Sequence, residues 1–270
     1  MSDVIRVIQY GLGPIGSATA RLITERDNLA LVGAVDIAPE KVGRDVGALI
    51  GLGRELGVEV APRLEEVDAE GDVVVHATSS HFELFLHQLL EILGAGFDIV
   101  STSEELSFPW RDHADRAAEG RMGHVGLLES AAMLFDTLGR KLVRFESTVE
   151  PILAEAPERT EYFDVPAGRV RGLLQTGHAF ADDDEFVTLT FRAALNEEPE
   201  GDTIRISGCP DLAVTPRGTN GDLATVAIAV NAIHRTKEAP PGLLTMRDIP
   251  IVTVSDARRA KAPATRGGRT

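Results

Sequence analysis

Short runs of β-branched residues alternate with helical patterns over the first hundred positions. The stretch Val73-Val74-Val75 lies in a continuous apolar run of the kind found in strands that are buried on both faces. Strands that alternate with helices in this way are typical of a parallel sheet covered by helices. The predicted strands are residues 5–10, 29–36, 72–79 and 98–103, and the predicted helices are residues 14–26, 40–50 and 82–93.

The pattern changes after about residue 111, where two helical stretches precede several longer strands with partial alternation. Strand following strand, with acidic loops between them, predicts an antiparallel sheet that has one solvated face. The predicted fold class is therefore α/β: an N-terminal Rossmann parallel sheet with a C-terminal α+β domain built on a mostly antiparallel sheet. The helices are expected at 111–120, 123–140 and 223–233, and the strands at 141–150, 169–180, 186–195 and 202–208.

This pattern predicts a first domain over residues 1–120 and a second domain over residues 121–256. Residues 257–270 contain Ala, Pro, Gly and Arg but little that could be buried, which predicts a disordered basic tail. The tail has five basic residues and no acidic one, so the rest of the chain has a net charge of −20.

The overall charge balance argues against partners that are themselves anionic. The 270 residues include 27 Lys and Arg against 42 Asp and Glu, a formal net charge of −15. A protein that binds phosphate backbones or anionic lipid needs a basic surface, and the body of this chain has no cationic surplus from which to build one. We therefore expect neither a nucleic acid nor a membrane as a partner.

The single cysteine, Cys209, excludes an intramolecular disulfide and any zinc or iron–sulfur site built on several cysteines. The first nine residues lack a basic signal-peptide start, and the longest apolar stretch is far below the roughly 20 residues of a membrane span. These features predict a cytoplasmic protein. None of the seven histidines has metal-site spacing, and His76 and His87 are interpreted as structural.

The strongest motif is a glycine loop that directly follows the first strand and opens the first helix. In a G-x-G-x-x-G loop the first glycine makes the turn, the second lets the backbone approach a pyrophosphate, and the third allows close helix–strand packing. A plain strand–turn–helix, in which the glycines serve only packing, is the alternative. The cofactor-binding residues predicted from this loop are Gly11, Leu12, Gly13, Pro14, Ile15 and Gly16.

Asp36 ends the second strand twenty residues after Gly16, where a carboxylate would accept hydrogen bonds from the adenosine ribose. Its charge would repel a 2′-phosphate and so favours NAD, but Lys41 and Arg44 are near enough to offset that repulsion. The cofactor is therefore expected to be NAD, with NADP as the alternative. Arg44 is included among the cofactor-binding candidates, although a solvated helix face is the favoured interpretation of it.

Small hydroxyl residues end the two later strands, at the sheet edge where a parallel sheet binds its ligand. Thr78 and Ser79, with Thr102 and Ser103, are expected to line the dinucleotide and leave room for the nicotinamide ring. Glu104 and Glu105 come next. Their spacing from Ser101 and Thr102 fits capping boxes, but a carboxylate facing the nicotinamide pocket could instead bind an ammonium group or act as a general base.

Several stretches together resemble the 2,4-diaminopentanoate dehydrogenases and the related native amine dehydrogenases, which share the fold of dihydrodipicolinate reductase. The resemblance implies an NAD(P)-dependent oxidoreductase, a homodimer, that interconverts an amine and a ketone plus ammonia. It makes residues 1–120 the dinucleotide-binding domain and residues 121–256 the substrate and dimerisation domain. It places the catalytic carboxylate on the Glu104-Glu105 pair, with Glu104 favoured, and His124 in a substrate-binding helix. The stretches that resemble the family are residues 11–16, 101–106, 123–130, 231–233 and 241–246.

The chain departs from the family pattern near residue 119. Family members have a further strand, a loop ending in Asn-Pro-Gly and a long helical stretch between the helix that corresponds to 111–118 and the Gly-His-Val-Gly motif, whereas here residues 118–122 run directly into that motif. This predicts that an internal segment is lacking. Two alternatives to an amine dehydrogenase follow: a dihydrodipicolinate reductase-like enzyme, although no His-His pair is present, or a catalytically silent dinucleotide-binding protein.

Overall fold

The protein folds into two compact units, the first of which is made of two separate stretches of the sequence. The structure, a computed structural model, describes residues 4–103, 126–160, 163–198 and 200–254. One unit comprises residues 1–103 and 221–270, and the other comprises residues 104–220. The predicted boundary at residue 120 lies outside the described residues. The predicted second domain differs at residues 221–254, which join the first unit because their helix packs on its sheet.

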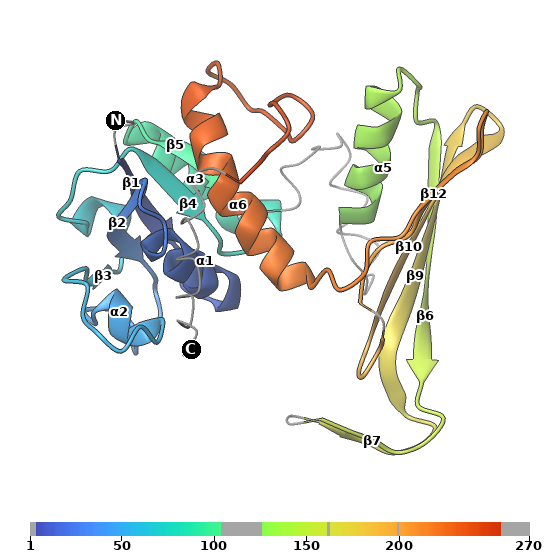
Figure 1. Ribbon diagram of the computed structural model, residues 1–270, viewed down its shortest axis with the longest axis horizontal. Helices are drawn as coiled ribbons and strands as arrows, with labels where there is room; N and C mark the ends of the chain where they lie inside the picture. Colours follow the sequence, from blue (N-terminus) through green and yellow to red (C-terminus); the bar gives the residue numbers. More distant parts are fainter. Residues whose placement is uncertain (1–3, 104–125, 161–162, 199, 255–270) are drawn as a thin grey trace, which may run out of the picture. The chain divides into compact units, whose positions relative to one another are not determined.

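The first unit is built on a five-stranded parallel sheet in the order β3-β2-β1-β4-β5 (Figure 1). All four neighbouring pairs in this sheet are parallel, which confirms the predicted Rossmann topology. The chain begins in the middle of the sheet, builds outward through β2 and β3, and then crosses to the other side of β1 to form β4 and β5. A ligand is therefore expected beyond the carboxyl ends of β1 and β4, where the order reverses. The strands are β1 (Ile5–Tyr10), β2 (Leu29–Val35), β3 (Val60–Ala61), β4 (Val73–His76) and β5 (Asp98–Ser101).

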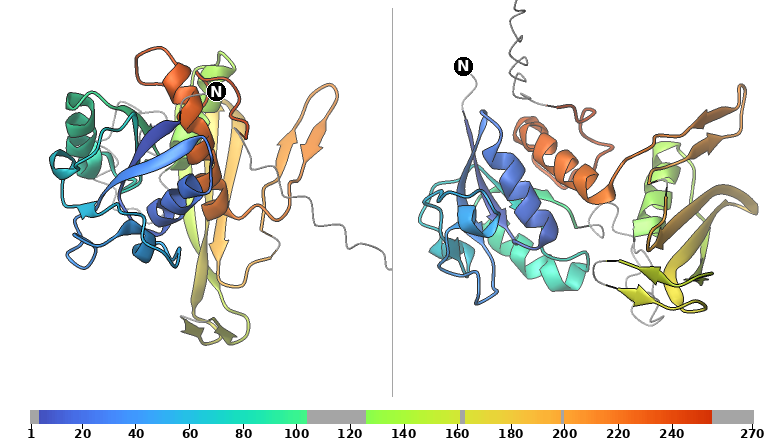
Figure 2. Two further views of the ribbon diagram at one scale, coloured as in Figure 1. Left: turned by 60° about the vertical axis from the view of Figure 1, so that its left-hand side comes forward. Right: turned by 60° about the horizontal axis from the view of Figure 1, so that its bottom comes forward.

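Helices cover both faces of this sheet. On one face, α1 (Pro14–Thr24) and α6 (Gly221–Glu238) lie side by side (Figures 1 and 2) and bury side chains such as Ile23 and Ile233 against Val7 and Val73. On the other face, α3 (Phe82–Gly94) buries Ile92 in a second cluster of apolar side chains. Because successive residues of a strand point to opposite faces, the unbroken valine run of β4 supplies both clusters.

The predicted helix over 40–50 is wrong in extent, since only Val46–Leu49 forms α2. The residues before it form turns, with Gly43 in the left-handed region, and Asp45 accepts hydrogen bonds from the amides of Gly47 and Ala48 at the start of α2. The same carboxylate also accepts from the amides of residues 56–58. Asp45 therefore begins the helix and holds the following loop against it. The 3-10 helix η1 (Leu64–Glu66) follows β3, and neither was predicted.

The second unit contains α5 (Gly126–Thr137) and a three-stranded antiparallel sheet in the order β10-β9-β6. These strands, β6 (Arg144–Leu153), β9 (Val170–Ala181) and β10 (Asp184–Ala194), correspond to predicted ones. Exposure alternates along β6, and Phe135 of α5 belongs to the cluster of apolar side chains that contains Ala179 of β9. The sheet thus has one face that packs on α5 and one that is solvated. Two small hairpins complete the unit: β7 (Glu158–Arg159) with β8 (Asp164–Val165), and β11 (Ile204–Ile206) with β12 (Leu212–Val214).

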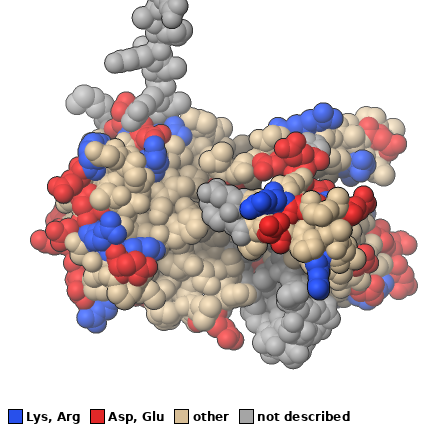
Figure 3. All heavy atoms as spheres, turned by 90° about the horizontal axis from the view of Figure 1, so that it is seen from below, with Lys and Arg blue, Asp and Glu red and all other residues tan. Residues whose placement is uncertain are grey.

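Acidic and basic side chains are intermixed over the face of the molecule drawn in Figure 3. Within the described part of the chain, no helix is long and apolar enough to cross a membrane. The predicted basic tail lies outside the described residues.

Candidate dinucleotide site

The glycine loop has the close backbone contacts that its motif predicts. Gly11 follows β1 with a φ of +92°, and a Cβ atom on it would lie 2.4 Å from the carbonyl oxygen of Ala77. A Cβ on Gly16 would lie 2.0 Å from the Gly11 carbonyl oxygen. Gly13 differs from both, because a Cβ there would meet nothing within 4 Å and its φ is −66°. The fold therefore requires glycine at positions 11 and 16, and Gly13 leaves open space beside the loop.

The first turn of α1 presents backbone donors to that open space. Gly13 is the N-cap, Pro14 is the first helical residue, and no side chain caps the helix. The amides of Ile15 and Gly16 have no intrahelical acceptor, because they lie in the first turn. Free amides and the positive end of the helix dipole together favour a bound anion. The loop therefore fits the pyrophosphate of a dinucleotide.

Asp36 lies at the end of β2, as predicted, but its carboxylate is held by the protein itself. Oδ2 accepts from the Leu12 amide at 2.7 Å and from Lys41 Nζ at 3.0 Å, and Oδ1 accepts from the Ala38 amide at 2.9 Å. Desolvation alone would raise the pKa of Asp36, but these three donors together lower it below its usual value. The side chain is therefore a carboxylate at neutral pH, and its charge is balanced by Lys41.

Lys41 also donates to the Leu12 carbonyl oxygen at 3.0 Å, so it ties the glycine loop to the end of β2. This contact was not predicted, since the sequence indicates only that a lysine is five residues beyond Asp36. Arg44 is exposed and donates to the Glu40 carbonyl oxygen, in keeping with the alternative interpretation of a solvated position.

The hydroxyl residues after β4 and β5 lie together at one edge of the parallel sheet. Ser103 donates its hydroxyl to the Ser79 carbonyl oxygen at 2.8 Å, and the Thr102 amide donates to the His76 carbonyl oxygen at 3.1 Å. The methyl carbon of Thr78 is 2.9 Å from the place of a Cβ on Gly11, so Thr78 borders the glycine loop. The structure therefore brings these four residues to the same edge as the loop, where the dinucleotide is predicted to bind.

His76, which was interpreted as structural, takes part in this arrangement. It is fully buried at the carboxyl end of β4, and its two ring nitrogens contact Ser101 on one side and Gln88 and Thr78 on the other. Burial, opposed by the hydrogen bond with Gln88, lowers the pKa of His76 below its usual value. A polar ring that directly follows a buried valine run was the available signal in the sequence.

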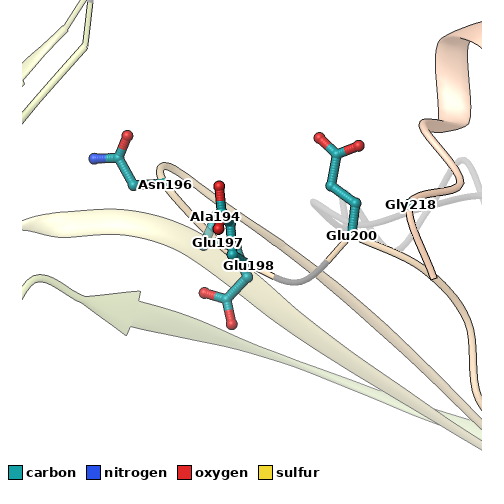
Figure 4. Close-up of a pocket in the computed structure, with 6 residues that line it drawn as sticks. All are labelled: Ala194, Asn196, Glu197, Glu198, Glu200 and Gly218. Atoms are coloured by element: carbon teal, nitrogen blue, oxygen red, sulfur yellow. The ribbon is translucent and has the colours of Figure 1, made fainter.

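The predicted catalytic pair Glu104 and Glu105 and the predicted substrate residue His124 lie outside the described residues. Within the described ranges, no three His, Cys, Asp or Glu side chains are grouped as a metal site would require. A separate acidic hollow lies in the second unit (Figure 4). It is lined by Ala194, Asn196, Glu197, Glu198, Glu200 and Gly218, none of which was predicted as a site residue.

Residues 112–262 match the family model of the 2,4-diaminopentanoate dehydrogenase C-terminal domain. The chain belongs to this family. Residues 5–102 match the family model of the N-terminus of dihydrodipicolinate reductase, which agrees with the parallel sheet and glycine loop of the first unit. These matches place the chain among the NAD(P)-dependent oxidoreductases and confirm the predicted class of cofactor.

Three similar proteins span different shares of the chain. The 2,4-diaminopentanoate dehydrogenase of Acetoanaerobium sticklandii is 32% identical over 137 residues, which are 48% of this chain and 38% of that enzyme. The chain thus aligns with well under half the length of that relative. The 4-hydroxy-tetrahydrodipicolinate reductase of Methanopyrus kandleri is 28% identical over 276 residues, which cover 90% of this chain and 95% of that enzyme.

Among solved structures, an amine dehydrogenase from Mycobacterium smegmatis has a TM-score of 0.78 at 22% identity, over 93% of this chain and 98% of that one. This likeness supports the observed fold, a parallel Rossmann sheet with a second unit built on antiparallel strands.

Proposed function

We propose that this protein is an NAD(P)-dependent oxidoreductase that interconverts an amine and a ketone plus ammonia. The observation that supports it most is the family match over residues 112–262, in a chain whose glycine loop and uncapped helix are built for a dinucleotide. The substrate is a diamino acid or a simple amine. We further infer a homodimer, as the family resemblance implies, and light scattering of the purified chain tests it.

The proposed reaction removes a hydride from the carbon that bears the amine. NAD(P)⁺, when bound, accepts that hydride, and the amine carbon becomes an iminium carbon after one proton is released. Water then adds to the iminium carbon, and the carbon–nitrogen bond breaks to give the ketone and ammonium. The overall balance is one protonated amine, one oxidised cofactor and one water converted to a ketone, an ammonium ion, a reduced cofactor and a proton.

The proposed division of roles follows the family resemblance. Glu104, or failing that Glu105, binds the ammonium group or activates the attacking water, and His124 helps to bind the substrate. Orientation of the amine carbon beside the cofactor supplies much of the acceleration, because a positioned reaction avoids the entropy cost of encounter. The residues at the dinucleotide are Gly11 to Gly16, the Asp36–Lys41 pair, and the hydroxyl residues Thr78, Ser79, Thr102 and Ser103.

The ion pair of Asp36 with Lys41 bears on the choice between NAD and NADP. An unpaired carboxylate at the end of β2 would exclude a 2′-phosphate by repulsion. Here the charge of Asp36 is balanced by Lys41, whose Nζ atom lies 3.0 Å from Asp36 Oδ2. We infer that the protein accepts both dinucleotides. A strict preference for NAD would mean that the carboxylate charge still dominates at the ribose.

Two other functions remain as alternatives, each favoured by one observation. The Methanopyrus kandleri relative, which aligns over 90% of this chain, favours a dihydrodipicolinate reductase-like activity. The run of residues 118–122 directly into Gly123-His124, with no Asn-Pro-Gly motif in the sequence, favours a silent dinucleotide-binding protein that lacks an internal segment.

One set of assays separates these functions. The chain is titrated with NADH and NADPH, and is then incubated with NAD⁺ or NADP⁺ and a panel of short diamines, amino acids and simple amines, while absorbance at the reduced-cofactor band is followed. Amine-dependent reduction supports the proposal. Binding without reduction by any amine overturns it in favour of the silent protein, and reduction of a dihydrodipicolinate-type substrate overturns it in favour of the reductase.

Substitution of the carboxylates tests the proposed roles. Glu104→Gln is expected to reduce turnover by about a hundredfold or more, the usual contribution of a general acid or base, and to leave the affinity for NADH unchanged. Glu105→Gln is the matched control. If Glu105→Gln is the variant that loses turnover, the role moves to that residue, and if neither loses it, the carboxylate proposal is wrong.

A further inference from the structure

The ring of His76 joins two segments that border the dinucleotide site. It follows three buried valines in β4, and its own exposed fraction is 0%. Nδ1 lies 3.1 Å from Ser101 Oγ, at the end of β5, and Nε2 lies 2.8 Å from Gln88 Oε1 of α3 and 2.9 Å from Thr78 Oγ1. One buried side chain thus connects the residues that follow β4 with those that end β5.

The hydrogen bonds around the ring have a consistent direction. Thr78 donates its hydroxyl to Gln88 Oε1 at 2.6 Å, so that oxygen accepts, and Nε2 of His76 must donate to it as well. A neutral ring with its proton on Nε2 has an accepting Nδ1, which receives the hydroxyl of Ser101. Ser101 Oγ in turn accepts from the Ser103 amide at 3.2 Å. The directions of these hydrogen bonds therefore all follow from Gln88 Oε1, which can only accept.

The network ends at groups that face the predicted cofactor. Thr78 is exposed and its methyl group borders Gly11, so the orientation of its hydroxyl depends on Gln88 and thereby on the ring. On the other side, the Ser103 hydroxyl holds the Ser79 carbonyl oxygen at 2.8 Å. The segment after β4 and the segment after β5 are therefore joined in two ways: by their contacts with the His76 ring, and directly by the hydrogen bond of Ser103 with Ser79.

We propose that His76 is a positioning residue, which orients the hydroxyl groups after β4 and β5 for binding of NAD(P). This inference rests on the proposed dinucleotide function. It predicts that loss of the ring nitrogens weakens cofactor binding, because the bound dinucleotide then has to order side chains that the ring now holds in place.

The same network predicts a dependence of binding on pH. The groups packed on the ring are Tyr10 of β1, Phe85 and Gln88 of α3, Thr78, and the serines Ser101 and Ser103, none of which is an anion at neutral pH. The nearest carboxylate in these contacts is Glu91, which accepts from the Tyr10 hydroxyl at 3.1 Å. Protonation of Nδ1 would turn it from an acceptor into a donor facing the Ser101 hydroxyl, so binding should weaken as the pH falls below the usual range for histidine.

The test compares His76→Phe, His76→Gln and Thr78→Val with the native chain by titration of NADH and NADPH between pH 5 and 8. Phenylalanine keeps an aromatic ring but no nitrogen, whereas glutamine can still reach Gln88 and Thr78. We expect the dissociation constant at pH 7.5 to rise about tenfold in His76→Phe and about threefold in His76→Gln and in Thr78→Val, the losses typical of one or two hydrogen bonds. In the native chain the dissociation constant should increase at low pH, and this increase should be absent from both His76 variants.

His87→Asn is the matched control, because His87 lies on α3 but is exposed. It should bind like the native chain and keep the native pH profile. If both His76 variants keep the native affinity and profile, the positioning role is wrong while dinucleotide binding stands. If His76→Phe does not fold, Thr78→Val with native affinity overturns the inference by itself. If the native chain binds neither dinucleotide, the proposed function fails and this inference fails with it.

Discussion

Lys41 places one positive charge where the adenosine ribose of the cofactor is expected. Its Nζ atom is 3.0 Å from Asp36 Oδ2, and its side chain is only 25% exposed. Substitution of Lys41 by Met should therefore leave an uncompensated carboxylate beside the ribose. We expect the dissociation constant for NADPH to rise about tenfold more than that for NADH, since a charge-assisted hydrogen bond is lost and a repulsion is restored. Parallel titrations with the two cofactors measure this ratio.

Arg44→Met provides the control for this substitution, because Arg44 is exposed and is bonded to a backbone oxygen. It should leave the ratio of the two dissociation constants unchanged. If Lys41→Met and Arg44→Met change this ratio equally, the net charge of the region, and not the Asp36–Lys41 pair, determines the preference between NADH and NADPH.

We expect Gly13 and Gly16 to be glycines for different reasons: ligand binding requires the first and the fold requires the second. A methyl group at Gly13 would meet nothing within 4 Å, whereas one at Gly16 would lie 2.0 Å from the Gly11 carbonyl oxygen. Gly13→Ala should therefore keep the native melting temperature and lose at least about tenfold in NADH affinity, because the methyl group occupies the approach to the pyrophosphate. Gly16→Ala should lower both the melting temperature and the affinity for NADH. Native NADH affinity in Gly13→Ala would show that no dinucleotide approaches this loop.

At the scale of elements, an ion pair joins the two central strands of the parallel sheet. The guanidinium of Arg6 on β1 donates to both carboxylate oxygens of Asp72, just before β4, at 2.9 and 3.1 Å. This hydrogen bonding lowers the pKa of Asp72 to about 2. Because the folded pKa lies below the unfolded one, the pair stabilises the fold above about pH 4 and loses that effect as the pH falls through about 2.

Asp72→Asn should accordingly cost on the order of 1 kcal/mol in free energy of unfolding at pH 7, after allowance for solvent screening. The difference from the native chain should shrink below pH 4 and vanish near pH 2. Denaturant titrations at several pH values measure it. Glu70→Gln, which removes the other, 90% exposed partner of Arg6, should change little at any pH. A difference for Asp72→Asn that does not vary with pH would exclude the ion pair as its cause.

The elements that the sequence predicted well are those with a strong local signal. The path from β1 through the glycine loop to α1 and β2 was predicted within two residues at each end, because periodicity and glycine act locally there. The helix predicted over 40–50 is too long, because Asp45 caps α2 and so the helix begins only at Val46. The same carboxylate accepts hydrogen bonds from the amides of a later loop, which the sequence does not indicate. Strand β3 has two residues, too few for any pattern to show.

Residues of the candidate site were predictable as positions but not as contacts. Asp36 was placed at the end of β2, but nothing in the sequence shows that the amides of Leu12 and Ala38 already occupy its carboxylate. His76 was interpreted as structural because it was expected to point from a strand into the packing of the sheet. Its partners Ser101 and Gln88 were not predicted, since they come from other elements of the fold. Contacts of this kind arise only when the sheet is assembled.

At the scale of the whole molecule, α6 returns to the first unit after the chain has built the second. The apolar run over residues 223–233 predicted a helix that returns to the antiparallel sheet, but such a run does not show which sheet a helix packs on, and α6 packs on the parallel one. Lys237 of α6 pairs with Asp98 of β5 at 2.9 Å, and Ile233 is fully buried beside Val7 and Val73. The Rossmann sheet of this protein is therefore covered on one face by a helix that is distant in sequence.

Ile233→Ala tests this assignment of α6. Removal of a fully buried isoleucine should cost about 2–4 kcal/mol in free energy of unfolding, from lost apolar burial and the cavity that remains. If α6 belongs to the first unit, the same denaturant midpoint should govern loss of helix signal and loss of NADH binding, and both should shift together in this variant.

Ile228→Ala is the control for Ile233→Ala, because it makes the same substitution in the same helix and so changes helix propensity equally. The side chain of Ile228, however, is 41% exposed. The loss there should be below about 1 kcal/mol, because little apolar surface returns to water. The difference between the two variants isolates the packing of α6 on the parallel sheet from any change in intrinsic helix stability. Equal losses, or a shift in Ile233→Ala that leaves NADH binding at its native midpoint, would place α6 outside the cooperative unit that binds the cofactor.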